Sequence, residues 1–215
     1  MNVLFDNFHD FRDGFIGTLS ITLVSTAIAL VLGIVIAGFR VSPVPPLRYF
    51  GTAWVTLLRN TPLTLLFLVS AFVIPEILFP GMSSFVLGSL AVGFYTSAFV
   101  CEAVRSGINT VPLGQAEAAR SLGMTFSQTL RLIVLPQATR TVLPPLSSIL
   151  IALTKNTAIA GAFSVTELFG WQKAVSEQGY AILPVFFWVA VGYLIITFAY
   201  SAVFRLLERR LEVAR

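Results

Sequence analysis

Long runs of apolar residues, separated by short clusters of charge and proline, dominate the sequence. The first run is the clearest, since residues 14–39 contain no charged side chain and Arg40 ends it. About 20 apolar residues are enough for a helix to cross a bilayer. The pattern therefore predicts a single all-α transmembrane domain, a polytopic membrane protein with five transmembrane helices at about residues 14–39, 53–74, 83–105, 130–153 and 181–205.

Proline interrupts two of these predicted spans. The second contains the sequence Arg59-Asn60-Thr61-Pro62, and the fourth contains Pro136, Pro144 and Pro145. Proline lacks a backbone donor and clashes with the preceding helical turn, so we expect the fourth span to kink. In a membrane such a break is tolerated only where protein or a water-filled cavity satisfies the freed backbone groups.

The polar connection between the third and fourth predicted spans carries helix start and stop signals. Pro112 suits the first turn of a helix, and Gly123 suits its left-handed end. Thr125 and Gln128 have the spacing of a capping box that would start the next helix. We therefore expect a short helix at about residues 112–123, rich in small residues, outside the bilayer. On this pattern alone it could be a simple connector.

Composition narrows the possible functions. Hydrophobic residues make up 56% of the chain and charged residues 11%, against about 25% charged in soluble proteins. The single cysteine and single histidine exclude a disulfide framework and a conventional zinc cluster. Neither Lys155 nor Lys173 lies in a phosphate-binding loop. We therefore predict no metal site, no bound cofactor and no enzyme activity in this chain. Nucleic acid is not an expected partner either, because the basic residues do not cluster with exposed aromatic ones.

The charges divide between the two predicted faces of the membrane. Most arginines follow the first span, surround the connection between the third and fourth spans, or lie in the C-terminal tail. Acidic residues dominate the other side, where residues 162–180, with Glu167, are expected to form a surface helix and loop. The positive-inside rule then places the N-terminus outside and the C-terminus in the cytoplasm. The expected location is the bacterial cell (inner) membrane, which the chain would cross several times.

The polar connection also carries a longer motif. Glu117-Ala118-Ala119, then Gly123, then Ile133-x-Leu135-Pro136 resembles the EAA signature of ABC importer permease subunits. The likeness extends over roughly residues 15–205. Residues 40–44, 59–64 and 105–111 look closest to the actinobacterial glutamate permeases of the family's polar amino acid branch, and further segments resemble that branch as a whole. These segments are Arg59-Asn60-Thr61-Pro62, Glu102-x-x-Arg105, Gly114-Gln115, Gln137-Ala138-x-Arg140 and Lys155-Asn156-Thr157.

The resemblance implies an ABC type I importer permease fold and a division of labour between subunits. ATP would be bound by a partner ATPase dimer, a second permease subunit would complete the pathway, and an extracellular solute-binding protein would deliver the substrate. A heterodimer of permeases is favoured, and a homodimer stays possible. The short helix would be the coupling helix that contacts the ATPase, through Gly114, Gln115, Glu117, Ala118, Ala119, Arg120 and Gly123.

Further candidate functional residues follow from the same resemblance and from the high free-energy cost of placing charges in lipid. The candidate substrate pathway comprises Arg59, Asn60, Thr61, Pro62, Tyr95, Ser148, Lys155, Asn156 and Thr157. Structural or gating roles are assigned to Glu102, Arg105, Pro136, Gln137 and Arg140. Arg59 and Lys155 could instead be interfacial side chains that reach towards the headgroups. Ser148 departs from the family, which often has asparagine near this position.

The predicted function is that of a permease subunit in an ATP-driven amino acid importer, with glutamate as the expected substrate. An ATP-independent carrier or channel for small polar solutes is the main alternative. It predicts internal repeats and carboxylates in mid-span, and the sequence has no clear repeat. A scaffold for a membrane complex is a third possibility, in which Arg59 and Lys155 would be replaceable.

Overall fold

The computed structural model describes residues 2–211, and within that range every regular element is a helix. The short α1 (Asn2–Asp6) precedes α2 (Phe8–Val41), which is the first membrane-spanning helix. At 1.5 Å per residue, the 34 residues of α2 extend for about 51 Å, well beyond the hydrocarbon thickness of a bilayer. Small residues such as Gly33 lie on its buried side, where a Cβ would come within 2.6 Å of Val100.

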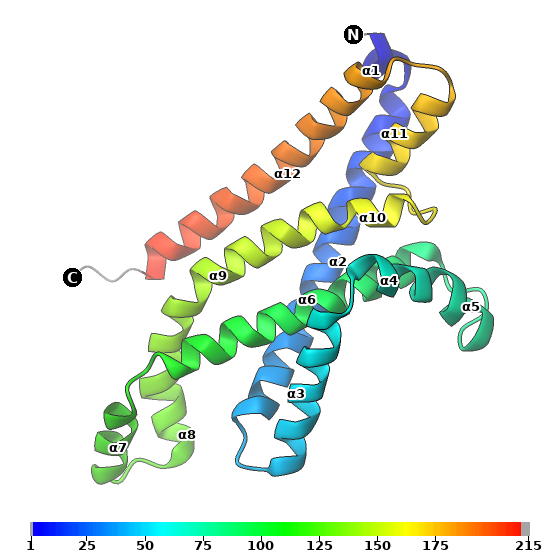
Figure 1. Cartoon of the computed structure of the whole chain (residues 1–215). Coiled ribbons are helices and arrows are strands. Elements are labelled where there is room, and N and C mark those ends of the chain that lie inside the picture. The colour runs from blue at the N-terminus through cyan, green and yellow to red at the C-terminus, as the bar shows by residue number, and fades with distance from the viewer. Residues whose placement is uncertain (1, 212–215) are drawn as a thin grey trace.

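The second predicted span is sharply bent. It consists of α3 (Pro45–Asn60), followed by α4 (Leu63–Leu68), the π-helical η1 (Val69–Val73) and α5 (Ile74–Ile77). The two halves are bent by 100° at a break of a few residues. Thr61 and Pro62 have extended backbone there (ψ 129° and 133°), since the residue before a proline avoids the helical region. Figure 1 shows α4 and α5 turning away from the axis of α3.

The third span, α6 (Ser84–Asn109), lies at the centre of the molecule. It contacts α2, α3, α4 and α9, and much of its surface is buried, including Val92, Ala98 and Cys101. Gly107 allows α9 to approach closely, because a methyl group there would overlap the side chain of Val142.

The expected short helix is present as α7 (Leu113–Ser121). Gly123 follows it with a φ of +81°, and Thr125 with Gln128 forms a complete capping box at the start of the next helix. Both local predictions are therefore confirmed.

The fourth span starts earlier and ends later than the apolar pattern indicates. It runs through α8 (Phe126–Thr129), the π-helical η2 (Leu130–Val134), α9 (Leu135–Asn156) and α10 (Ala158–Gly161). The π-helical segment ends two residues before Pro136, so the missing backbone donor of this proline coincides with a local change of helical pitch.

The chain ends with α11 (Leu168–Glu177) and α12 (Ile182–Leu211). Figure 1 shows α1, α11 and the start of α12 at one end of the bundle and α7 and α8 at the other. Four helices in the described range are long and apolar enough to cross a membrane, and the bent α3–α5 segment makes five. Large apolar side chains such as Val31 on α2 and Phe198 on α12 are exposed, as lipid-facing or subunit-facing positions require.

Candidate functional site

A cluster of one carboxylate and three arginines lies in the half of the bundle nearest α7. Glu102 on α6 forms an ion pair with Arg40 at the end of α2, through Oε1. Its Oε2 accepts from Arg105, one turn along α6, at 3.2 Å. Arg59, the penultimate residue of α3, lies 3.8 Å from Oε1. Glu102 thus joins three helices, and the cluster carries a formal excess of positive charge.

Arg59 is held at the bend of the second span. Its guanidinium carbon lies 5.4 Å from the centre of the Phe99 ring, and that ring lies 5.1 Å from the ring of Tyr95. The next two residues close the helix: the Asn60 amide donates to Thr56 O, and the Thr61 hydroxyl donates to Leu57 O, both at 2.8 Å. The bend therefore fixes the position of Arg59 and satisfies the carbonyls at the end of α3.

A cavity of about 500 Å³ opens beside this cluster. Arg59, Glu102 and Arg105 line it from one side, and Thr141 and Pro145 of α9 line it from the other. Pro145, in the middle of α9, lines this space opposite the residues of α6. A cavity with charged walls in a membrane domain is suited to hold a small polar solute.

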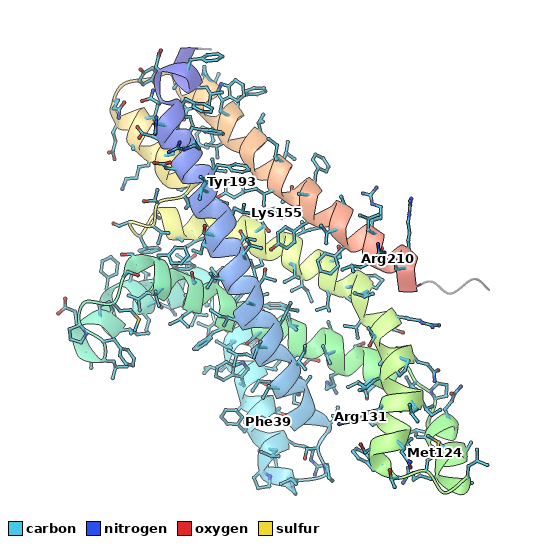
Figure 2. The ribbon with its side chains drawn as sticks, turned by 180° about the vertical axis from the view of Figure 1, so that it is seen from behind. Phe39, Met124, Arg131, Lys155, Tyr193 and Arg210 are labelled. Atoms are coloured by element: carbon cyan, nitrogen blue, oxygen red, sulfur yellow. The ribbon has the colours of Figure 1, made fainter. Side chains whose placement is uncertain are left out.

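The structure separates the predicted pathway residues into two groups. Arg59 lines the cavity, Asn60, Thr61 and Pro62 follow it at the bend, and Tyr95 packs against the cavity-lining Phe99. Lys155, Asn156 and Thr157 are not among the lining residues. Lys155 is ten residues beyond Pro145 on α9, which corresponds to about 15 Å of helix. Figure 2 shows Lys155 and Tyr193 in the half of the molecule away from Met124 and Arg131.

The second group is itself divided by exposure. Lys155 is exposed, Asn156 is half-buried, and Thr157 is fully buried with its hydroxyl donating to Thr154 O at 2.7 Å. Ser148 on α9 is exposed and is not among the residues that line the cavity. Arg59 lines the cavity, and neither Lys155 nor Ser148 does.

The short helix α7 presents most of its predicted contact residues to solvent. Gly114, Gln115, Glu117, Ala118, Arg120 and Gly123 are exposed. Ala119 is the exception, since it is 4% exposed and faces inward on the side where α7 packs against α8 and η2. The exposed set forms a surface that another protein can approach.

A side-chain hydrogen bond links α7 to the fourth span. The Gln137 amide donates to Gln115 Oε1 at 2.9 Å and also to Ile133 O at 2.8 Å. Pro136, beside it, is the second residue of α9, and Arg140, one turn further, is exposed. A displacement of α7 would therefore reach α9 at its first turn, next to the π-helical segment.

A second polar cluster, which the charge pattern did not indicate, lies around Glu167. This residue was grouped with the solvent-exposed charges, but it is fully buried at the start of α11. Its carboxylate accepts from the Tyr193 hydroxyl and from the Gly170 backbone N–H, each at 2.6 Å. The Leu168 N–H donates to the Thr18 hydroxyl at 3.0 Å, which ties the same turn to α2.

The expected surface helix at residues 162–180 is accordingly partly buried. Leu168, Trp171 and Val175 form an apolar face that packs against α2 and α12. Their spacing in the sequence was the signal that this segment would dock, and docking places Glu167 beside Thr18 and Tyr193. Burial raises the pKa of the Glu167 carboxyl, although the hydrogen bonds from Tyr193 and Gly170 act in the opposite direction.

Among the described residues, no group of three histidine, cysteine, aspartate or glutamate side chains could hold a metal ion. The chemistry that this arrangement offers is binding and movement: a charged cavity, an exposed short helix, and a hydrogen bond between that helix and the cavity-lining span.

Residues 29–213 match the family described as "Binding-protein-dependent transport system inner membrane component". The chain therefore belongs to this family, and it is a membrane-embedded permease subunit and not an enzyme. It is 40% identical over 214 residues to the "Probable glutamine ABC transporter permease protein GlnM" of Bacillus subtilis, covering 99% of this chain and 98% of that protein. It is 42% identical to the "Glutamate transport system permease protein GluC" of Corynebacterium glutamicum, covering 92% of each.

Solved structures agree with this assignment. A chain of an amino acid ABC transporter, crystallised with histidines, superposes with a TM-score of 0.87 at 29% identity and 96% coverage of both chains. A chain of the MetNI methionine ABC transporter, in an inward-facing conformation, superposes with a TM-score of 0.83 at 20% identity, covering 97% and 99% of the two chains. The predicted all-α ABC type I importer permease fold is confirmed.

Proposed function

We propose that this chain is a permease subunit of an ATP-driven importer for amino acids, with glutamate as its substrate. The family membership and the names of the glutamine and glutamate relatives support an amino acid substrate. The excess positive charge beside the cavity favours the more acidic of those two solutes. The proposal that transport is driven by ATP rests on α7. This helix presents an exposed motif and is hydrogen-bonded to the cavity-lining fourth span.

In this proposal α7 docks on a separate ATPase dimer that binds ATP, and this chain holds no cofactor. Closure of the ATPase pushes α7 as a rigid unit, because Pro112 and Gly123 end it on both sides. The Gln115–Gln137 hydrogen bond passes the movement to α9. A second permease subunit completes the pathway, and a heterodimer is favoured. An extracellular solute-binding protein delivers the amino acid at the opposite end.

The proposed orientation has α7 and the C-terminus in the cytoplasm and the N-terminus outside. Arg40, Arg48, Arg59 and Arg105 lie towards the α7 end of the chain's spans, and the C-terminal part of α12 adds Arg205, Arg209 and Arg210. Arginine on the cytoplasmic side agrees with the positive-inside rule.

The test is uptake of labelled glutamate by proteoliposomes that contain this chain, its partner permease, the ATPase and the binding protein. Glutamine, histidine and arginine serve as competitors. We expect ATP-dependent uptake that Glu117→Arg reduces at least about tenfold, since a reversed charge in a docked surface costs several kcal/mol. The control is Glu76→Arg, an exposed glutamate on α5, which should retain uptake. Uptake that persists without ATP would instead favour an ATP-independent carrier.

A Lys155→Gln variant, measured in the same vesicles, addresses the second group of predicted pathway residues. Glutamate uptake lost in this variant would support a pathway role for Lys155. Unchanged uptake would leave Lys155 as an exposed interfacial side chain and restrict the charged pathway to the cavity beside Arg59.

A further inference from the structure

We propose that Arg59 and Arg105 form an anion site at the α7 end of the pathway, where they bind the side-chain carboxylate of the transported amino acid. Glu102 is then the internal counter-ion that holds the two guanidiniums in place when the site is empty. The inference rests on the proposed function, because it takes the ligand to be a solute of the importer.

The charge balance of the cluster is the first argument. One carboxylate faces three guanidiniums, and its two oxygens are already used by Arg40 and Arg105. Arg59 lies 3.8 Å from Oε1, beyond hydrogen-bond distance, and makes no hydrogen bond to any of residues 2–211. A guanidinium has five donors, so Arg59 is available to an outside acceptor.

Exposure separates the three arginines in the way that the proposal requires. The side chain of Arg40 is 13% exposed, while those of Arg59 and Arg105 are 47% and 39% exposed. The two exposed arginines line the cavity of about 500 Å³, and Arg40 does not. Arg40 therefore neutralises Glu102 from behind, and the unneutralised charge faces the cavity.

The other walls of the cavity suit a small polar solute with a carboxylate. Ser106 and Asn109 of α6 and Thr141 of α9 provide neutral hydrogen-bonding groups around the two arginines. The planar fork of arginine matches a carboxylate in a bidentate manner, and the pairing is stronger than with an amide. A site with two such forks discriminates glutamate from glutamine, which differ only in this group.

The experiment compares uptake of labelled glutamate with uptake of labelled glutamine in proteoliposomes that contain the complete importer. We expect Arg59→Gln and Arg105→Gln to lower the glutamate-to-glutamine ratio of kcat/KM by about tenfold or more, since a hydrogen bond to a charged group is lost. Arg59→Lys retains the charge without the fork, so it should lower the ratio by less.

The matched control is Arg48→Gln, an exposed arginine on the same helix as Arg59 and remote from the cavity. It should leave the ratio unchanged. Equal losses for both solutes in the Arg59 and Arg105 variants would indicate a structural role and overturn the inference. A wild-type importer that carries glutamine and not glutamate would overturn it too, while the amino acid importer function would stand. Wild-type complexes that carry no amino acid would contradict the proposed function itself.

Binding without turnover gives an independent measurement. In nanodiscs that contain the permeases and ATPase without the binding protein, saturating glutamate should raise the thermal midpoint of the complex, because a ligand that binds only the native state stabilises it. Arg59→Gln should abolish this shift and Arg48→Gln should retain it. A shift of equal size in both variants would contradict the anion site even if the complexes assemble poorly.

Discussion

Two carboxylates, Glu102 and Glu167, lie in different halves of the bundle and are stabilised in opposite ways. Glu102 is half-buried and surrounded by three charged arginines from α2, α3 and α6. Glu167 is fully buried and is met by neutral donors, a tyrosine hydroxyl and a backbone N–H. The first carboxylate is balanced by one mostly buried and two partly exposed arginines, whereas the second is enclosed by a shell of helix backbone and small residues.

The difference indicates which half of the molecule can rearrange. Long arginine side chains can exchange partners without moving a helix, so the Glu102 cluster can follow a shift of α3 or α6. The Glu167 shell cannot do so, since Gly161 and Gly170 pack directly against the carboxylate. We infer that the α7 half carries the movement and that the α11 half holds the adjoining parts of α2, α10 and α12 together.

The largest expected effect comes from Glu102→Gln. The substitution leaves three arginines with no ionised partner, and Arg40 is mostly buried. A fully buried pair costs about 3–5 kcal/mol when one partner is removed, and we expect about 2–3 kcal/mol here because the site is partly exposed. The measurement is the thermal midpoint of the complex in nanodiscs.

A double substitution sharpens this result. Arg40→Gln, added to Glu102→Gln, removes the most buried of the stranded charges and should restore part of the lost stability. The single variant Glu76→Gln, at an exposed position on α5, should match the wild type. If Glu102→Gln is as stable as Glu76→Gln, the three arginines do not depend on this carboxylate.

Local signals in the sequence were sufficient for the parts of the fold that depend on neighbouring residues. Gly123 and the Thr125–Gln128 capping box predicted the end of α7 and the start of α8. Glu102 and Arg105, assigned structural or gating roles, are paired across one helical turn. The family signature predicted the fold class, because it carries information that no single helix provides.

Contacts between residues that are far apart in the sequence could not be predicted from such local signals. Arg40 is 62 residues from Glu102 in sequence, and nothing in its own surroundings indicates that partner. The bend of 100° depends on where α4 docks as well as on Pro62, so the second span was predicted as one segment. Glu167 was assigned to the surface because charge usually indicates solvent, whereas the docking of α11 decides its burial.

Gly161→Ala is expected to have the next largest effect. A methyl group at this position would overlap Glu167 Oε1 and lie 2.6 Å from Gly170 N, which is backbone and cannot move aside. Overpacking of this kind costs about 1–3 kcal/mol. Gly38→Ala on α2, where a Cβ meets nothing within 4 Å, is the matched control and should be neutral or stabilising. Equal thermal midpoints for the two variants would show that the shell around Glu167 is not rigid.

The smallest effect, and the most direct test of the comparison, is expected from Glu167→Gln. The glutamine carbonyl can still accept from Gly170, and the shell offers no positive charge that would be left without a partner, so stability at neutral pH should change by less than about 1 kcal/mol. The same substitution at Glu102 removes a charge that three arginines need. Comparable losses at both positions would remove the distinction between the two carboxylates.

The pH dependence of stability tests the direction in which the pKa of Glu167 is shifted. Burial raises the pKa of Glu167 above its value in the unfolded chain, so the folded state binds this proton more tightly. The stabilisation that this tighter proton binding gives the folded state is complete below the glutamate pKa of the unfolded chain, about 4.3. It is lost as the pH rises through the raised pKa of Glu167 in the folded state. In Glu167→Gln this decline should disappear, and the difference in thermal midpoint between variant and wild type should grow in favour of the variant between acidic and neutral pH. A difference that stays constant over this range would mean that the donors from Tyr193 and Gly170 keep the carboxylate ionised despite its burial.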